Sequence, residues 1–201
     1  MTMLASNEGS YRDFSEVPSE EAFCDGAHDA GSPQARLLAA EFERLYTRVY
    51  RYLLHRTFNP EMADELCAQT FHRAAASTNK MPRETVRMEA WLLRVATNVA
   101  NTQYRKQRIR RLLLGRFADS KRSADRPDME ATSVEEQRKA RIRAIVAGLA
   151  PKYQAVVVMR FYSHMSHAEI ATVLNCTEVA VRKRLSRAVR RLRERFTDEL
   201  S

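Results

Sequence analysis

The chain has 201 residues, enough for one large or two small domains, and 44% of them are hydrophobic. The net charge of +9 at pH 7 is unevenly spread, because residues 1–35 carry a net charge of −6 and the remaining 166 residues therefore carry +15. This balance favours an anionic partner, and nucleic acid is favoured over a membrane because no apolar run is long enough to enter a bilayer.

The cysteines and the N-terminus indicate a reducing compartment. Cys24, Cys67 and Cys176 are scattered, without the C-x-x-C spacing of a metal or redox site. The first residues lack the basic-then-apolar order of a signal peptide. We therefore expect a cytoplasmic protein with no membrane insertion. With 5 glycines, 6 prolines and no alternating strand pattern, the chain is predicted to be all-α.

The first 35 residues form an acidic extension. They are rich in serine and glycine and contain seven acids against a single Arg12. No apolar periodicity appears in them. This composition predicts a disordered segment.

Residues 36–112 are predicted to form a small helical domain. An apolar stripe at helical spacing gives a first helix that ends near Thr57. Asn59 and Pro60 then supply the cap and the first position of a second helix. After the loop "STNKMPRET", a third helix places Trp91 toward the core and continues into the basic stretch "YRKQRIRR".

A linker is predicted over residues 113–132. The stretch is polar, contains Gly115 and Pro127, and has no apolar stripe. Nothing in its composition would lock the flanking domains together, so we expect them to adopt many relative orientations.

Residues 133–201 are predicted to form a second helical domain that contains a helix-turn-helix. Ser166 and Glu169 have the spacing of a capping box at the start of a short helix. The turn "NCT" follows, with Asn175 tolerating a left-handed backbone and Thr177 capping the next helix. An αα-hairpin of an ordinary bundle is the alternative to a DNA-binding motif.

The helix after this turn is strongly cationic, which favours DNA binding. Its apolar stripe is formed by Val181, Leu185, Ala188, Leu192 and Phe196. The arginines and lysines fall largely off that stripe, and only Glu178 and Glu194 lie among them. A merely solvated basic face usually carries more i,i+4 partners, although for any single arginine that interpretation stays open.

Both domains resemble one family. The segment "LAPKYQAVVVMRFYSHMSHAEIATVLNCTEVAVRKRLSRAVRRLRE" resembles the promoter-binding domain of bacterial sigma factors of the sigma-70 family, most closely the extracytoplasmic-function (ECF) group. The segments "FERLYTRVYRYLL", "ADELCAQTFHRA" and "AWLLRVATNVANTQYRK" resemble the region 2 domain of the same group. The order of the two domains makes the resemblance more specific than either alone.

The resemblance implies a dissociable subunit of RNA polymerase without enzymatic activity, cofactor or metal. Region 2 would bind the polymerase core and melt the −10 element, and region 4 would recognise the −35 element. Expected partners are the core enzyme (coiled coil of the largest subunit and flap), promoter DNA and an anti-sigma factor. We expect that inhibitor to cover both domains, and a fold-back of residues 1–35 onto the basic faces is the rival idea.

The resemblance also assigns residues to three surfaces. The −35 surface would comprise Thr177, Arg182, Lys183, Arg184, Ser186, Arg187 and Arg190. The −10 surface would comprise Asn79, Lys80, Arg83, Arg87, Asn98, Tyr104 and Arg105. The polymerase surface would comprise Asp64, Glu65 and Gln69. Trp91 is interpreted as a core residue, and Glu61 as a helix-start acid that serves the dipole.

Two other functions remain as alternatives. A stand-alone helix-turn-helix regulator would need a ligand or receiver domain, which residues 1–132 do not resemble. A sigma mimic that sequesters an anti-sigma factor would need no cationic DNA face. An enzyme is disfavoured, because the histidines show no metal spacing and no phosphate-binding glycine loop is present.

Overall fold

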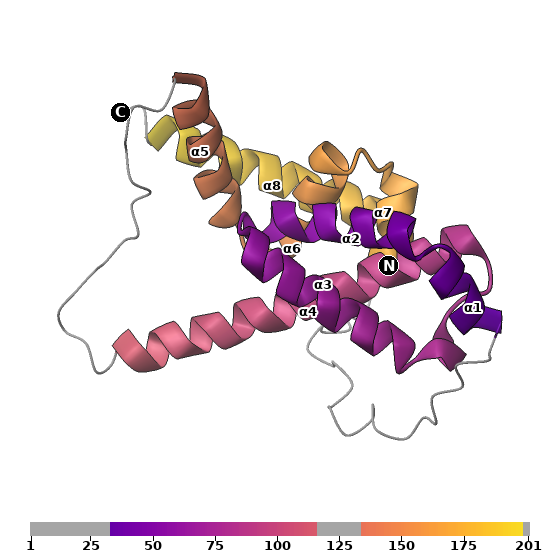
Figure 1. Cartoon of the computed structure of the whole chain (residues 1–201). Coiled ribbons are helices and arrows are strands. Elements are labelled where there is room, and N and C mark those ends of the chain that lie inside the picture. The colour runs from indigo at the N-terminus through magenta and orange to yellow at the C-terminus, as the bar shows by residue number, and fades with distance from the viewer. Residues whose placement is uncertain (1–32, 116–133, 199–201) are drawn as a thin grey trace, which may run out of the picture.

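The computed structural model describes residues 33–115 and 134–198 (Figure 1). Within these two stretches the chain forms eight α-helices, one 3-10 turn and one π-helical turn, and no strand. The prediction of an all-α fold is confirmed.

Three long helices make up the first module. Its elements are α1 (Pro33–Ala40), α2 (Phe42–Thr57), α3 (Pro60–Ala75), the 3-10 turn η2 (Thr78–Lys80) and α4 (Thr85–Gly115). Leu45, Leu53, Leu66 and Leu92 are fully buried between α2, α3 and α4. Asn59 caps α3 as predicted, since its side chain accepts a hydrogen bond of 2.8 Å from the amide of Met62.

The second module is organised around its last helix. Its elements are α5 (Val134–Ala147), α6 (Pro151–Val157), the π-helical turn η3 (Val158–Tyr162), α7 (His167–Leu174) and α8 (Glu178–Asp198). Helix α8 packs against α5, α6 and α7. Val146, Leu149, Tyr153 and Ala188 are buried where α8 meets α5 and α6.

Several element boundaries differ from the expected ones. Helix α1 begins at Pro33, inside the segment expected to be disordered, and the predicted first helix is broken at Glu41. Helix α4 runs to Gly115, which is past the predicted start of the linker. The rest of the expected extension and linker, residues 1–32 and 116–133, lies outside the described residues, as does Cys24.

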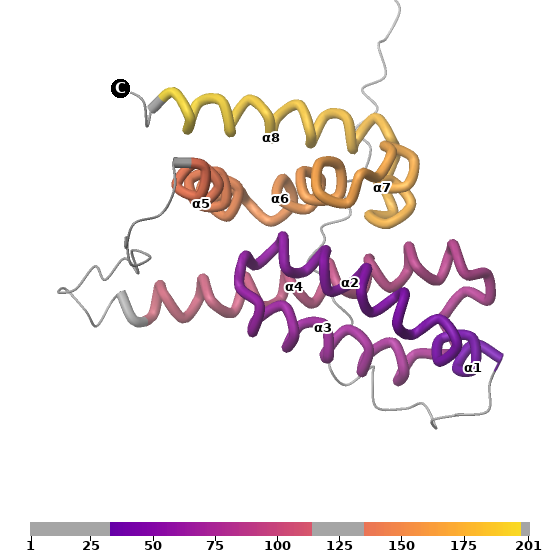
Figure 2. Tube along the Cα trace, turned by 45° about the horizontal axis from the view of Figure 1, so that its top comes forward, coloured from indigo at the N-terminus to yellow at the C-terminus, as the bar shows by residue number. Residues whose placement is uncertain are grey.

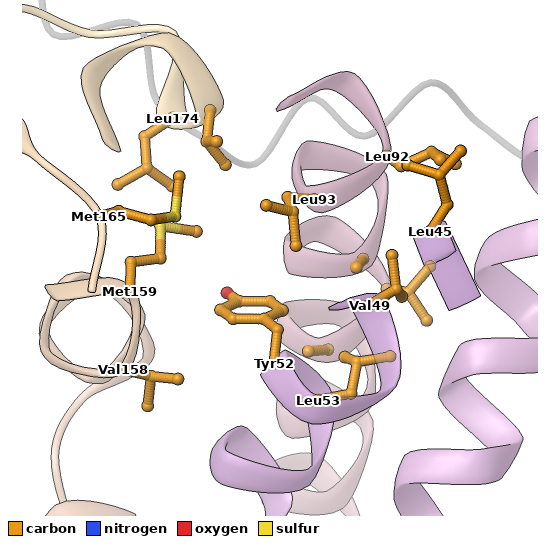
Figure 3. Packing of buried hydrophobic residues seen from close by; sticks show 14 of the residues in the cluster. Leu45, Val49, Tyr52, Leu53, Leu92, Leu93, Val158, Met159, Met165 and Leu174 are labelled. Carbon is orange, nitrogen blue, oxygen red and sulfur yellow. The ribbon is translucent and has the colours of Figure 1, made fainter. Parts of the chain in front are cut away.

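The two modules pack directly on each other, which contradicts the expectation of many relative orientations. Helices α2 and α4 contact α6, η3 and α7, and one continuous hydrophobic cluster includes residues of both modules. Figure 2 shows the second module lying over α2 and α4, with α3 on the far side. The reason is that apolar side chains on the surfaces of α2 and α4 pack against the second module, whatever the composition of the linker (Figure 3).

None of the helices within the described stretches is long and apolar enough to cross a membrane. Cys67 and Cys176 are free thiols. Burial, together with the nearby charge of Asp64, raises the pKa of the Cys67 thiol to about 12, so this thiol stays protonated at neutral pH.

Candidate nucleic-acid and polymerase interfaces

The turn between α7 and α8 has the predicted chemistry. The capping box at the start of α7 is formed, with Ser166 N–H donating to Glu169 (2.7 Å) and Glu169 N–H donating to the Ser166 hydroxyl (3.2 Å). Asn175 adopts the left-handed conformation with φ of 48°. The hydroxyl of Thr177 accepts from the amide of Ala180 (3.2 Å), which caps α8. The turn therefore fixes the angle at which α8 leaves α7.

Helix α8 is held by its apolar stripe, so its opposite face is free for a ligand. Val181 and Ala188 are fully buried, and Leu185 is partly buried between the two hydrophobic clusters. Near the C-terminal end, the guanidinium of Arg191 lies 4.5 Å from the centre of the Tyr153 ring. This cation–π contact gives Arg191 a role in packing. The sequence pattern does not distinguish Arg191 from the other arginines of α8.

The outer face of α8 presents most of the predicted −35 residues together. Arg182, Lys183, Ser186, Arg187 and Arg190 are all exposed. Two of the arginines have carboxylate neighbours one turn away, Arg182 with Glu178 (3.6 Å) and Arg190 with Glu194 (3.7 Å). Such exposed pairs contribute about 0–1 kcal/mol each, so they do not prevent a phosphate or a base from replacing the carboxylate.

Arg184 stands apart from this group. It is partly buried, and its guanidinium lies 3.8 Å from the sulfur of Cys176 in the turn. The Arg184 side chain therefore points toward the turn of the helix-turn-helix and away from the exposed cations. The sequence resemblance groups Arg184 with these cations on the −35 surface.

Three of the predicted −10 residues share one face of α4. Arg87, Asn98 and Arg105 are exposed. Asn98 and Arg105 follow Arg87 by about three and about five helical turns, so the three residues line up over roughly 27 Å of the helix. Tyr104 lies beside this row and is 37% exposed. A face of this length with cations at both ends and an amide between them suits an extended strand with an unstacked base.

The other three predicted −10 residues lie before α4. Asn79 and Lys80 are exposed in η2, and Arg83 is exposed in the loop that follows. Arg87 pairs with Glu84 (3.0 Å) at the start of α4. Met81 is buried between these polar positions and anchors the loop to the core. The predicted −10 residues therefore lie on two neighbouring parts of the chain, the η2 turn with the loop after it and one face of α4.

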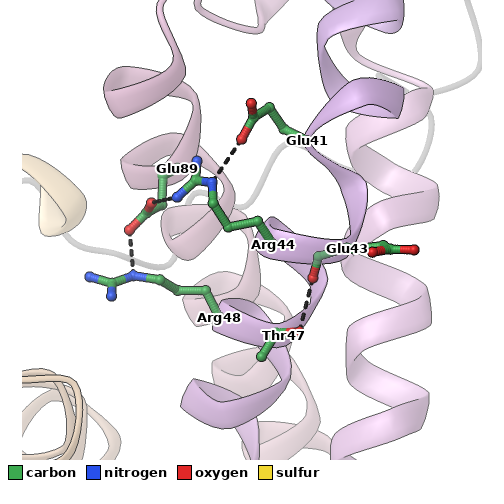
Figure 4. A network of polar contacts seen from close by, with 6 residues as sticks. All are labelled: Glu41, Glu43, Arg44, Thr47, Arg48 and Glu89. Atoms are coloured by element: carbon green, nitrogen blue, oxygen red, sulfur yellow. Dashed lines mark hydrogen bonds and ion pairs between the residues drawn. The ribbon is translucent and has the colours of Figure 1, made fainter.

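An ion-pair network fixes α2 against the N-terminal half of α4 (Figure 4). Arg44 bonds to Glu41 (2.7 Å) and to Glu89 on α4 (2.8 Å), and Arg48 also pairs with Glu89. Hydrogen bonds to the two carboxylates raise the pKa of Arg44. The network sets the position of the helix that bears three of the predicted −10 residues. The pairs with Glu89 were not predictable from the sequence, because Arg44 and Arg48 are about 40 residues away from it in the chain.

The predicted polymerase residues lie together on α3. Asp64 and Glu65 are exposed, while Gln69 is partly buried and donates to Glu65 (3.1 Å). Asp64 accepts a long hydrogen bond of 3.4 Å from the hydroxyl of Tyr46 on α2. The described part of the chain has no group of three or more side chains with metal-ligand chemistry.

An aromatic cluster beside these acids was not found from the sequence. Phe42, Tyr46, Tyr50 and Phe71 have ring centroids 5.0–6.2 Å apart, with Phe42 43% exposed. Burial and the nearby charge of Asp64 raise the pKa of Tyr46, which keeps its hydroxyl as a donor. An exposed aromatic edge next to carboxylates is typical of a protein-binding surface.

Two family models match the chain. Sigma-70 region 2 matches residues 42–110, which contain α2, α3 and most of α4. Sigma-70 region 4 matches residues 139–192, which contain the helix-turn-helix.

Curated relatives align with most of the chain. The ECF RNA polymerase sigma factor BldN of Streptomyces coelicolor is 30% identical over 166 residues, which cover 80% of this chain and 62% of BldN. The ECF RNA polymerase sigma factor SigL of Mycobacterium tuberculosis is 27% identical over 164 residues, which cover 82% of this chain and 91% of SigL. The chain thus spans less than two thirds of BldN but nearly all of SigL.

Solved structures share the fold. The sigma factor RpoE in complex with the anti-sigma factor NepR from Bartonella quintana matches with a TM-score of 0.54 and 17% identity, covering 79% of this chain and 96% of that one. CnrH in complex with the cytosolic domain of CnrY matches with a TM-score of 0.51 and 23% identity. The match covers 86% of this chain and 93% of that one.

Proposed function

The chain belongs to the sigma-70 family, in its ECF group, and on that premise we propose that it binds RNA polymerase core and directs transcription initiation from selected promoters. The observation that carries this proposal is the presence, in one chain and in family order, of a polar face on α4 and an exposed cationic face on α8. The proposal involves no covalent chemistry. The proposed partners of the protein are promoter DNA and RNA polymerase, so we expect the protein to act in the bacterial cytoplasm.

We assign −35 recognition to the N-terminal half of α8. Arg182, Lys183, Ser186 and Arg187 lie on consecutive turns of its exposed face. Arginine and lysine match guanine edges and phosphate oxygens, and the short Ser186 lets the helix approach the bases closely. The capped N-terminus at Thr177 adds free amides that suit a phosphate.

We assign −10 melting to the face of α4 and to the loop before it. Melting needs a site that holds an unstacked base and cations that follow the separated strand. Asn98 supplies an amide with both donor and acceptor groups, and Arg87 and Arg105 supply charge on either side of it. Asn79, Lys80 and Arg83 extend the polar surface at the N-terminal end of α4.

We assign polymerase binding to α3. Asp64 and Glu65 give a local negative charge on a basic protein, which suits a protein partner and disfavours DNA. The exposed ring of Phe42 contacts the ring of Tyr46, whose hydroxyl donates to Asp64. Phe42 therefore supplies apolar area next to these acids for the same contact.

Run-off transcription tests the proposal directly. Purified core polymerase on a genomic promoter library is expected to give new transcripts only when the protein is added. The free protein should bind duplex DNA weakly, because one recognition helix offers a limited contact area. Tight sequence-specific DNA binding without any gain from core polymerase would contradict the proposal and favour a stand-alone regulator.

An anti-sigma factor is the regulatory partner that we propose. The relative of known structure from Bartonella quintana is bound to one. Such a partner need not be large here, because the two modules already lie against each other. Co-purification from the native bacterium, followed by loss of core binding on addition of the co-purified protein, is the test.

A further inference from the structure

Val179 is an exposed apolar residue in the first turn of α8, the helix to which we assign −35 recognition. Its side chain is 51% exposed, whereas Val181 and Ala188 of the same helix are fully buried. A single exposed valine on a protein surface needs no explanation by itself. What distinguishes this valine is where it lies on α8.

Val179 lies within the cationic face of α8 and opposite the buried stripe. Residues three, four and seven positions apart share one face of a helix that has about 3.6 residues per turn. Arg182, Lys183 and Ser186 stand at these distances from Val179, and all three are exposed. The buried Val181 lies about half a turn round the helix. Val179 is therefore an apolar residue inside the surface proposed to contact DNA.

Short side chains form the centre line of this face near its N-terminal end. Ser186 follows Val179 after about two turns, and Arg182 and Lys183 lie on either side of the line between them. Short side chains let the helix come close to the floor of a groove, while long cationic side chains reach base edges and phosphates on both sides. This arrangement would bring Val179 against the base edges.

The local structure fixes the direction of the valine. The hydroxyl of Thr177 accepts from the amide of Ala180 (3.2 Å), and Asn175 holds the preceding turn with φ of 48°. A valine in a helix has one strongly preferred rotamer because its Cβ is branched. In a helix-turn-helix, the N-terminal residues of the second helix contact base edges. Val179 therefore offers a rigid apolar group at the position where bases are read.

The chemistry of valine limits which base it can favour. Its side chain neither donates nor accepts a hydrogen bond, so it cannot pair with the polar groups of the base edges. The apolar group that bases present in the major groove is the 5-methyl group of thymine. Contact with this methyl group removes apolar surface from water. Against any other base, the valine would cover polar groups and leave them without partners.

We propose that Val179 is a specificity-determining residue that selects a thymine in the −35 element by packing on its 5-methyl group. Arg182 and Lys183 are each about one turn from Val179, so the thymine lies beside the base pairs that these cations contact. The inference rests on the proposed function, because α8 must enter the major groove of promoter DNA. It adds a preference that the cations do not supply, since arginine and lysine pair with guanine and phosphate.

Deoxyuridine tests the contact, because it differs from thymidine only in lacking the 5-methyl group. The full-length protein with purified core polymerase first selects promoters from a genomic library by run-off transcription. Each thymine in the −35 region of a selected promoter, on either strand, is then replaced in turn by deoxyuridine. The affinity of the holoenzyme for each labelled duplex is measured. Loss of one buried methyl group is expected to weaken binding about fourfold at the position that Val179 contacts.

Three variants assign this effect to Val179. Val179→Ala is expected to bind the thymine and deoxyuridine promoters equally at that position, since its side chain is too short to reach the methyl group. Val179→Ile keeps a branched apolar side chain and should keep the preference. Val86→Ala, at a valine of α4 that is 77% exposed, is the matched control and should also keep it. Because Val179 is exposed, its variants should have the melting temperature of the wild type, which separates a lost contact from a lost fold.

Three outcomes overturn the inference and leave the proposed function in place, because transcription with core polymerase still occurs in each. The selected promoters share no thymine in the −35 region, or the wild-type holoenzyme binds thymine and deoxyuridine duplexes equally at every −35 position. In the third outcome, Val179→Ala keeps the full preference for thymine, so another residue makes the contact. Absence of transcripts from every promoter would instead overturn both the proposed function and this inference.

Discussion

Arg184 and Arg187 lie three residues apart on α8 and have different surroundings. Arg187 is exposed on the outer face, whereas Arg184 is partly buried and directed at Cys176. Their residue type and spacing predict similar roles. Only the position of the turn relative to α8 separates them, and that position depends on the left-handed Asn175. Arg187 is therefore the better candidate for base recognition.

Replacing Arg187 by alanine should weaken binding to −35 DNA by about 1–3 kcal/mol if the guanidinium makes a bidentate contact with guanine. The measurement is run-off transcription on promoters that vary one base at a time, and the loss should depend on one position. Arg193→Ala, at an exposed arginine farther along α8, is the control. A uniform loss over all −35 sequences would show that Arg187 binds phosphate only.

Replacing Asp64 by asparagine should reduce the affinity for core polymerase roughly tenfold, or about 1.4 kcal/mol, since a cationic group of the polymerase would lose its charged partner. The matched control is Glu61→Gln, an exposed acid of the first turn of the same helix whose role is with the helix dipole. Titration of labelled protein with core polymerase gives both affinities. Equal losses for the two variants would contradict the assignment of Asp64.

At the level of elements, the helix starts that have a capping side chain were predictable, whereas the start of α1 and the interruptions of helices were not. Asn59, Ser166 and Thr177 cap helices where their side chains indicated, because capping is a local interaction within about one turn. The break at Glu41 carries no proline or glycine signal. The π-helical η3 likewise has no sequence mark, and its end is fixed by bonds such as Arg160 to the carbonyl of Met165 (2.9 Å).

The capping box of α7 should make stability depend on pH. Hydrogen bonds from Ser166 lower the pKa of Glu169, with a further contribution from the charge of Arg48. A carboxylate whose pKa is lowered on folding stabilises the protein above its unfolded pKa of about 4.3, and the stabilisation is lost as the pH falls through the folded value. Glu169→Gln should therefore cost about 0.3–1 kcal/mol at pH 7 in low salt.

That cost should shrink in acid, and chemical unfolding of both proteins between pH 7 and pH 3 measures it. Glutamine retains an acceptor for the Ser166 amide, so the comparison isolates the charge. A difference between the two proteins that stays constant over the whole range would show that the charge of Glu169 does not contribute.

At the scale of the whole molecule, the two modules and their order were predictable, and their contact was not. Arg56 and Arg94 are indistinguishable in the sequence from solvated basic residues. Tyr52 and Met165 fit the core of their own modules equally well. Only the three-dimensional arrangement shows that these residues join the two modules, since their partners are about 80–100 residues away in the chain.

This contact gives a definite expectation for the acidic extension. Within the described residues, the bonds and apolar contacts between the modules are made by α2, α4, α6, η3 and α7, and we expect these contacts to persist without residues 1–32. Deleting residues 1–32 should therefore leave transcription with purified core polymerase unchanged at cellular salt, where a short acidic segment is screened beyond about 8 Å. Run-off assays of the full-length and shortened proteins at low and physiological salt measure this. Activation by the deletion, with stronger inhibition of the full-length protein at low salt, would show instead that the extension inhibits in cis on the cationic faces of α4 and α8.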